Sequence, residues 1–394
     1  MLSTPFSPWP SFTEQEIDAV SSVLRSNKVN YWTGQEGRSF EKEFALFCNS
    51  KYAVALANGT LALDLALKVL DIKAGDEVIV TSRTFIASIS SIINTGATPI
   101  FADVELDSQN ISARTITEVI SKKTKAILCV HLAGWPCEMD EIMELADTHD
   151  LFVIEDCAQA HGTKYKGKPV GSIGHIGAWS FCQDKIMTTG GEGGMLTTNN
   201  ELLWRSAWAY KDHGKSYAAV YETEHPEGYR WLHETFGTNW RLTEMQSAIG
   251  RIQLTRMSDW TSSRTENANR IRTTCQKYNW LIVPEVPEYI EHAYYKCYIQ
   301  IDMDKLNPDY SRDKIINKIV NKGVPCFSGS CSEVYKEKAF DGTQLRPKSP
   351  LKNAQLLGEN SLMFLVHPTL THEEVYKTCR ILTDVFSEIE QMTK

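Results

Sequence analysis

The feature that most constrains the fold is a repeated alternation of short apolar runs with helical segments in the first half of the chain. The runs are rich in β-branched residues and lie at Tyr52–Ala57, Glu77–Thr81, Thr98–Ala102, Ala126–Val130 and Leu151–Ile154. Helical spacing of apolar residues follows the first run over Thr60–Leu70 and the second around Ile86–Thr95. Apolar strands separated by helices are typical of a mainly parallel sheet buried on both faces. The sequence therefore predicts an α/β fold.

The pattern changes after two helices predicted over 242–254 and 262–277. Beyond them, strand-like runs are predicted over 292–301 and 323–327, and a closing helix over about 371–392. This mixture is typical of a separate α+β unit, and a chain of 394 residues is long enough for two domains. We expect a large domain over residues 1–265 and a small C-terminal domain over residues 266–394.

Composition excludes several classes of function. A net charge of -8 is unlike that of a protein that neutralises nucleic-acid phosphates. The N-terminus lacks the pattern of a signal peptide, and every apolar run is shorter than the ~18 residues of a membrane span. The ten cysteines are scattered, and the nearest pair, Cys326 and Cys331, lacks metal-site spacing. We expect a cytoplasmic protein with reduced cysteines, no metal site, no nucleic-acid partner and no membrane segment.

Lys185 lies in the most informative stretch, GAWSFCQDKIMTTGGEGGMLTT at residues 177–198. The lysine is followed by a glycine-rich turn, which lets the backbone approach a ligand closely. A partly desolvated lysine there can lose its proton near neutral pH and form a Schiff base. The alternative is a solvated surface lysine before an ordinary turn.

Asp156 ends an apolar strand in VIEDCAQAHG, residues 153–162. Ligands in α/β sheets gather at the carboxyl ends of strands, and an enzyme that uses pyridoxal 5'-phosphate (PLP) needs an acidic partner for the pyridinium nitrogen. The alternative is a carboxylate that caps the next helix. A further strand-to-helix junction, ANGT at 57–60, predicts either a phosphate site or an ordinary helix start.

Taken together, the motifs resemble one family from about Pro10 to the C-terminus. They include ANGTLALDLAL, SRTFIAS, GATPIFADV, EDCAQAHGT, WSFCQDK, GGEGGM and GTNWRLTEMQSAIG, in order along the chain. The chain resembles the DegT/DnrJ/EryC1/StrS sugar aminotransferases, within fold type I of the PLP enzymes. The resemblance implies a large domain with a mainly parallel mixed sheet flanked by helices, and a smaller C-terminal α+β domain.

The resemblance also implies roles for individual residues. Lys185 matches the Schiff-base lysine and Asp156 the carboxylate on the pyridine nitrogen. The other cofactor contacts that it implies are Gln159 near the phenolic oxygen, Phe85 stacked on the ring, and Gly59, Thr60 and Ser180 on the phosphate. Asn239, with Arg241 as the alternative, matches a residue that reaches the phosphate of a neighbouring subunit. A homodimer with shared active sites is therefore expected.

The activity implied is transfer of an amino group from L-glutamate to a nucleotide-linked keto-sugar, with pyridoxamine 5'-phosphate as the intermediate form of the cofactor. A 4-keto-6-deoxyhexose for a surface polysaccharide or glycan is favoured. A 3-keto sugar, a cyclitol aminotransferase and a PLP-dependent sugar dehydratase are the alternatives. Lys185 argues against the dehydratase, since such relatives often carry histidine there. A regulator that senses PLP would need a DNA-binding extension, and a protein with a dead site would lack Lys185 or Asp156.

Two features depart from the family pattern. Asp184 stands where relatives more often carry an uncharged residue, and it would raise the pKa of Lys185 if it pointed inward. We expect it to point away. The long stretch Tyr210–Thr238 is rich in aromatic, His and Lys residues. By resemblance it meets the sugar nucleotide, and the alternative is a plain surface loop.

Overall fold

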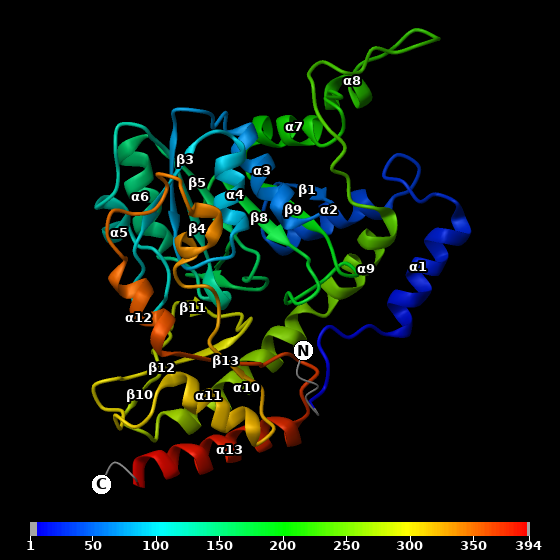
Figure 1. The fold of residues 1–394 in the computed structure, drawn as a ribbon. Helices are drawn as coiled ribbons and strands as arrows, with labels where there is room; N and C mark the ends of the chain where they lie inside the picture. Colours follow the sequence, from blue (N-terminus) through cyan, green and yellow to red (C-terminus); the bar gives the residue numbers. More distant parts are fainter. Residues whose placement is uncertain (1–5, 392–394) are drawn as a thin grey trace.

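The computed structural model describes residues 6–391, and the predicted domain ends at 1–5 and 392–394 lie outside them. The described part contains a seven-stranded sheet in the order β1-β9-β8-β5-β4-β2-β3 (Figure 1). Its strands are β1 (Tyr52–Leu56), β2 (Glu77–Thr81), β3 (Thr98–Ala102), β4 (Thr124–Val130), β5 (Phe152–Asp156), β8 (Ile176–Ser180) and β9 (Gly194–Thr198). Only the pairings of β9 with β1 and β8 are antiparallel. This mainly parallel sheet confirms the predicted α/β fold.

Helices cover both faces of the sheet because its strands are apolar on both sides. In β1, for example, Val54 and Leu56 belong to one hydrophobic cluster, and Ala53 and Ala55 belong to another. The first face is covered by α3 (Gly59–Val69), α4 (Ala87–Asn94) and α7 (Glu201–Tyr210). The second face is covered by α2 (Glu36–Phe47), α5 (Ala113–Thr117), α6 (Met139–His149) and α9 (Glu244–Thr255).

A second unit lies below the large sheet in Figure 1 and is built on an antiparallel sheet in the order β10-β12-β14-β13. Its strands are β10 (Leu281–Ile282), β12 (Cys297–Ile301), β13 (Cys326–Phe327) and β14 (Ser361–Phe364), and its helices are α10 (Met257–Cys275), α11 (Arg312–Asn321) and α13 (His372–Gln391). The remaining elements are α1 (Glu14–Ser26), α8 (Tyr217–Tyr221), α12 (Lys352–Asn360), the short strands β6 (Lys164–Tyr165), β7 (Lys168–Pro169) and β11 (Ile290–Glu291), and the 3₁₀ turns η1 (Leu132–Gly134), η2 (Val334–Lys336) and η3 (Lys338–Phe340). No helix within 6–391 is long and apolar enough to cross a membrane.

The chain crosses between the two units more than once. The proposed boundary at residue 265 falls inside α10, which is one continuous helix. Farther along, Val334, Tyr335 and Phe340 pack into the core of the large sheet, and Phe6 packs against the core of the second unit. The division at residue 265 stays a prediction. Through these contacts, a segment from each side of that position packs against the unit on the other side.

The strand expected over 292–301 is interrupted, which corrects the sequence prediction. Residues 292–296 connect β11 to β12 and pair instead with the loop after β4: the Ala293 and Tyr295 N–H groups donate to the carbonyls of Gly134 and Ala133. Tyr294 adopts a φ of 45°, which a continuous strand does not allow. These tertiary bonds bring this connection to the large sheet.

An extended arm leaves the body after α8 and returns before residue 237 (Figure 1). Its base is closed by a bridge between Lys215 and His233. Three aromatic side chains on it are largely exposed: Tyr229 at 75%, Trp231 at 83% and Phe236 at 100%. The role expected for this stretch, contact with the sugar nucleotide, stays a prediction.

Candidate active site

The candidate site lies where the carboxyl ends of β5 and β8 meet the start of α3. Asp156 ends β5, Ser180 ends the neighbouring strand β8, and Gly59 begins α3. A Cβ on Gly59 would stand 2.5 Å from the Ser180 Cβ, so only glycine permits this approach. The helix is capped by Asn58, whose side chain accepts the Leu61 N–H. The first N–H groups of a helix have no partner within it, so this junction can hold an anion.

Asp156 is a buried carboxylate with neutral hydrogen-bond donors. Its side chain accepts the Ala158 N–H at 3.1 Å and the Ser88 hydroxyl at 3.0 Å, and the residue is 6% exposed. Burial raises the pKa of Asp156, and the bonds from Ala158 and Ser88 and the charge of Lys185 offset part of that effect. Within 6–391 no basic side chain forms an ion pair with it. Such a carboxylate is stabilised by a cationic ring N–H.

Lys185 lies in the turn after β8 and is held from several sides. Its backbone carbonyl accepts the indole N–H of Trp9 at 2.8 Å, and its Nζ lies 5.3 Å from the centroid of the Tyr295 ring. Its side chain is 17% exposed, which rules out the solvated surface lysine considered above. An amine that is largely shielded from solvent is suited to act as a nucleophile.

Asp184 does not point away from Lys185, which corrects the sequence expectation. Its carboxylate lies 3.9 Å from the Lys185 Nζ and accepts a hydrogen bond from the Tyr295 hydroxyl. Burial alone would raise the pKa of Asp184, but the charge of Lys185 and the bond from Tyr295 hold it below the usual value. The carboxylate stays 60% exposed, and the charge of Lys185 and the bond from Tyr295 hold it on the side of the lysine.

Gln159 and Phe85 border the same site. The Gln159 carbonyl oxygen accepts the Ala133 N–H at 2.8 Å, which leaves the amide NH₂ as the end that can donate to a ligand. Phe85 immediately precedes α4 and is 70% exposed, so its ring offers a bare apolar face. Both arrangements suit the contacts that the family resemblance implies for these residues.

Among residues 6–391, Asn239 and Arg241 form no hydrogen bond or ion pair with the site residues described above. The segment runs next to β1, where the Ala57 N–H donates to the Trp240 carbonyl. Arg241 forms an ion pair with Asp212, and Asn239 forms a backbone bridge with the same residue. Their expected contact with the phosphate of a second subunit stays a prediction.

Sequence reasoning missed three residues of the site. Ser88 lies three positions after Phe85 in SRTFIAS. Helical spacing of that motif could have indicated that Ser88 lies on the same side as Phe85. Trp9 and Tyr295 contact the Lys185 turn from 176 and 111 positions away along the chain, by bonds to Lys185 and Asp184. No local pattern signals such distant contacts.

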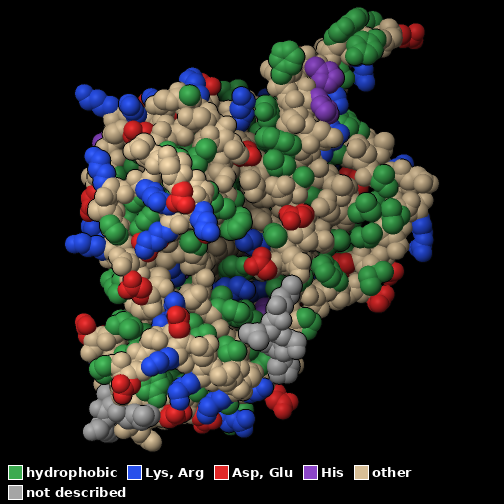
Figure 2. Space-filling model, in the orientation of Figure 1, with side chains coloured by type: hydrophobic (Ala, Val, Ile, Leu, Met, Phe, Trp, Pro, Cys, Tyr) green, Lys and Arg blue, Asp and Glu red, His purple; other side chains and the backbone are tan. Residues whose placement is uncertain are grey.

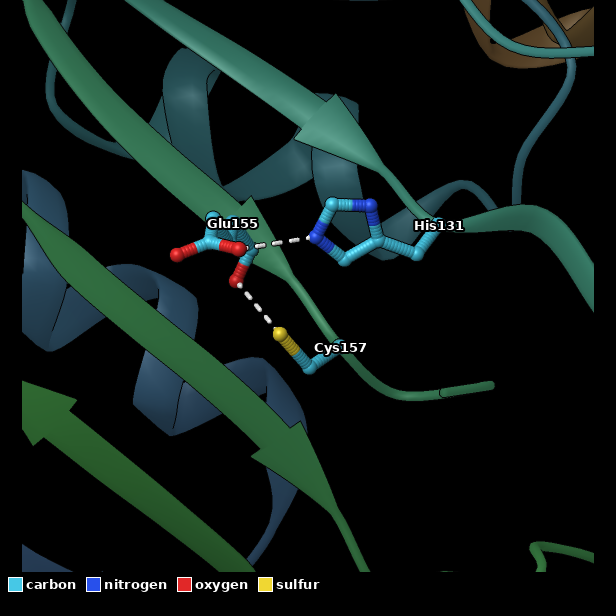
Figure 3. A group of neighbouring side chains, drawn as sticks. All are labelled: His131, Glu155 and Cys157. Atoms are coloured by element: carbon cyan, nitrogen blue, oxygen red, sulfur yellow. Dashed lines mark hydrogen bonds and ion pairs between the residues drawn. The ribbon is translucent and has the colours of Figure 1, made fainter. Parts of the chain in front are cut away.

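A second group of polar residues lies around the carboxyl end of β5 (Figure 3). Its Glu155 precedes Asp156 in the strand, so the two side chains point to opposite faces. His131, Glu155 and Cys157 are buried and lie close enough to share a metal ion. However, the Glu155 carboxylate accepts His131 Nε2 at 3.0 Å together with the N–H groups of Gly171, Ile173 and Gly174. The other His131 nitrogen accepts the Cys137 N–H at 3.1 Å. The group therefore acts as an internal anchor that ties two loops to β5, and the expectation of no metal site stays a prediction.

The residues of the candidate site fit PLP on geometric and chemical grounds. The Gly59–Ser180 approach leaves a cradle of free N–H groups that a side chain would fill, which suits a phosphate. Asp156 is a buried carboxylate that needs a cation, and Lys185 is a shielded amine beyond it. These are the three groups that the phosphate, the ring nitrogen and the aldehyde of PLP require.

Comparison with known proteins gives the same result along nearly the whole chain. A model of the DegT/DnrJ/EryC1/StrS aminotransferase family matches residues 10–383. The GDP-perosamine synthase of Escherichia coli O157:H7 is 36% identical over 383 residues, covering 96% of this chain and 98% of that protein. The spore coat polysaccharide biosynthesis protein SpsC of Bacillus subtilis is 39% identical over 380 residues, or 95% of each chain. Other relatives are named for dTDP- and UDP-linked amino sugars.

Solved structures agree with this assignment. The X-ray structure of the aminotransferase from Psychrobacter cryohalolentis is 65% identical, has a TM-score of 0.97, and covers 98% of this chain and 100% of that one. A sugar aminotransferase from Streptococcus pneumoniae, solved in its PMP form, is 25% identical with a TM-score of 0.86, covering 98% of this chain and 99% of that one.

Proposed function

The chain belongs to the DegT/DnrJ/EryC1/StrS aminotransferase family, and from this membership we propose that it moves an amino group from L-glutamate to a nucleotide-linked 4-keto-6-deoxyhexose. As a member of the family it is a PLP-dependent sugar aminotransferase. The product would serve a surface polysaccharide or another glycan. Support comes from relatives named for GDP-, dTDP- and UDP-linked amino sugars and for a spore coat polysaccharide.

One observation carries the proposal: among residues 6–391 the buried Asp156 carboxylate has no ion-pair partner, and the shielded Lys185 amine lies near enough to act on it electrostatically. Asp156 is 6% exposed; burial raises its pKa, and the charge of Lys185 lowers it. A purely structural pair would form a direct ion pair, and these two do not. A group with a cationic ring N–H and an aldehyde would bridge the carboxylate and the amine.

Each of the described residues has a task in this mechanism. The N–H groups of Gly59 and Thr60 and the Ser180 hydroxyl would hold the cofactor phosphate. Asp156 would keep the pyridine nitrogen protonated, and Phe85 would cover the ring. PLP, when bound, supplies an electron sink that stabilises negative charge on the carbon that loses a proton.

Lys185 is the residue placed to move that proton. Its neutral Nζ would take the proton from the α-carbon of the amino donor and return it at the neighbouring carbon of the cofactor. Asp184, 3.9 Å from the Nζ, would stabilise the ammonium formed in between. Because the deaminated donor leaves before the keto-sugar enters the same site, the kinetics should be ping-pong.

Shared sites in a homodimer complete the proposal. Asn239, or Arg241 beside it, would reach the cofactor phosphate of a second copy. The arm at 222–236, with its exposed Tyr229 and Trp231, would contact the sugar nucleotide. Cross-linking and sedimentation of the protein, with the Asn239→Ala and Arg241→Ala variants assayed for PLP affinity, test this assembly.

The first experiment is an absorbance spectrum of the purified protein before and after L-glutamate. A band at roughly 400–430 nm that collapses toward roughly 330 nm indicates transamination of a lysine-bound cofactor. Lys185→Ala should abolish the first band, and Lys211→Ala, at a buried lysine paired with Glu41 elsewhere, should keep it if the protein folds. A protein that shows no band with added PLP would refute the proposal.

The substrate is identified in a second step. The glutamate-treated protein is mixed with 4-keto and 3-keto sugars linked to UDP, dTDP or GDP, and the return of the first band is followed. The aminated carbon is then located by NMR of the product. Return of the band with a 3-keto sugar or with a cyclitol alone would overturn the 4-keto assignment and leave the aminotransferase assignment intact.

A further inference from the structure

Lys296 is a partly buried lysine beside the site with no role in the mechanism above. Its Nζ lies 4.7 Å from the centroid of the Tyr295 ring, and the Lys185 Nζ lies 5.3 Å from the same centroid. Both side-chain amines therefore lie near one aromatic ring. Within the described part of the chain, no carboxylate lies within ion-pair distance of the Lys296 Nζ, although burial there disfavours an unpaired charge.

Positive charge is in excess around Lys296. Of the charged groups that act on it, Asp184 is acidic, and Lys185 and Arg264 are basic. Arg264 is 1% exposed, and its Nε and Nη2 have no hydrogen-bond partner among residues 6–391. Its Nη1 has only long contacts, at 3.4 and 3.5 Å, with the carbonyls of Tyr295 and Tyr294. Burial lowers the pKa of Lys296 to about 8 and that of Arg264 to about 9.

The backbone fixes Lys296 relative to the cofactor contacts. The Tyr295 N–H donates to the Ala133 carbonyl at 2.9 Å, and the Ala133 N–H donates to the Gln159 side chain at 2.8 Å. Two hydrogen bonds in series thus link Tyr295, the residue before Lys296, to a residue of the candidate site. Lys296 also lines a small hollow together with Ala133 and Tyr298. An unpaired ammonium held this firmly is prepared to receive an anion.

We propose that Lys296 binds a carboxylate of the amino donor, with Arg264 adding positive potential from behind. This inference rests on the proposed function, since it assigns a subsite for the donor. The α-carboxylate is one bond from the carbon that carries the amino group, so it must lie near Lys185 during the reaction. The diphosphate of a sugar nucleotide is separated from the keto carbon by the sugar ring and would lie farther away.

The same charge suits a site that takes two different substrates in turn. Glutamate brings a carboxylate that neutralises Lys296, whereas the keto-sugar ring is uncharged. A lysine can release its proton when the sugar is bound, which avoids a buried unpaired charge. The groups facing Lys296 are Asp184 and Lys185 from the turn after β8, Arg264 from α10, Tyr295 from its own segment, and His367, whose pKa burial lowers to about 3.

The test uses the holoprotein, the Lys296→Met variant and a matched control, Lys305→Met, in which an exposed lysine loses an ion pair with Asp302. Binding of glutarate, an unreactive dicarboxylate, is measured by titration calorimetry, and KM is measured separately for glutamate and for the keto-sugar nucleotide. Lys296→Met should weaken glutarate binding and raise the glutamate KM by about 10- to 100-fold, the range of a charge-assisted hydrogen bond. The sugar-nucleotide KM should change by less than about twofold. Lys296→Arg should restore most of the glutarate affinity.

Several outcomes overturn the subsite. A loss of affinity confined to the sugar nucleotide would assign Lys296 to the diphosphate. An unchanged glutarate affinity and unchanged KM values would show that Lys296 binds neither substrate. Wild-type holoprotein that does not bind glutarate refutes the subsite even if another donor is used. Binding that depends on Lys296 without any transamination refutes the proposed function alone. If Lys296→Met does not fold, the wild type decides: glutarate affinity should fall as pH rises through about 8, and a constant affinity would contradict the inference.

Discussion

Removal of the Ser88 hydroxyl gives the sharpest test of how the site works. Ser88 donates to Asp156 Oδ2 at 3.0 Å and contacts Thr84 Oγ1 at 2.9 Å, and it is 1% exposed, so water cannot replace it. A hydrogen bond to a charged group contributes about 1.5–3 kcal/mol, which corresponds to about 10- to 150-fold in an equilibrium or a rate. Ser88→Ala should therefore slow the glutamate half-reaction by up to about that factor.

The pH dependence of the same variant distinguishes its effect from a general structural loss. The bond from Ser88 lowers the pKa of Asp156, so its removal lets the carboxylate take a proton at higher pH. Activity that needs the charged carboxylate is lost as pH falls, and the acid limb of the rate profile should move upward. Stopped-flow absorbance with glutamate measures both effects. Ser90→Ala is the control, since Ser90 lies on the same helix and its hydroxyl donates to the Ile86 carbonyl rather than to Asp156. An unchanged rate and acid limb in a folded Ser88→Ala protein would refute the reasoning.

Three further predictions follow from the same geometry. Gly59→Ala places a methyl group 2.5 Å from the Ser180 Cβ, and it should weaken PLP binding by at least about tenfold in an absorbance titration. An unchanged PLP affinity would contradict the proposal that the phosphate lies where Gly59 approaches Ser180. Asp156→Asn should raise the Tm of the apoprotein at neutral pH, because burial raises the pKa of Asp156 in the folded state and the charged form is disfavoured there. In the wild type, protonated Asp156 favours the folded state at low pH, and this contribution is lost as pH rises through the folded pKa. The Tm values of the two proteins should therefore converge in acid. A lower Tm for Asp156→Asn than for the wild type at neutral pH would contradict the prediction. Trp9→Phe removes the indole bond to the Lys185 carbonyl, and it should shift the pH at which the 400–430 nm band titrates, whereas an unmoved titration would show that the bond does not position Lys185.

Local sequence was sufficient for the elements that carry the site. The apolar runs over 77–81 and 98–102 correspond to β2 and β3, and the helix predicted over 60–70 is α3 shifted by one residue at each end. These predictions succeeded because a strand buried on both faces and a helix with one apolar stripe are visible in a few residues. The GGEGG turn after Lys185 is equally local, since glycine there permits φ values such as 86° at Gly190 and 116° at Gly191.

Predictions that depended on distant contacts were less accurate. Residues 292–296 have the composition of a strand, yet they bond to the loop after β4 and deliver Tyr295 and Lys296 to the site. Asp184 was expected to face away because a carboxylate that points toward a lysine raises the pKa of that lysine. In the structure its carboxylate lies 3.9 Å from the Lys185 Nζ, because Tyr295 from the second unit supplies a hydrogen bond.

The sequence by itself determined the α/β class and the order of the strands along the chain, and its motifs predicted which lysine, carboxylate and glycine would form a PLP site. Each of these is encoded within a short window, either in hydrophobic periodicity or in residue type. Only the tertiary structure decided which donors hold Asp156, which groups surround Lys185, and how much positive charge is left unpaired. Those properties arise from burial and from partners more than 60 positions apart, such as Ser88 with Asp156 or Trp9 with Lys185. Desolvation and hydrogen bonding act through space, so they have no signature in neighbouring letters.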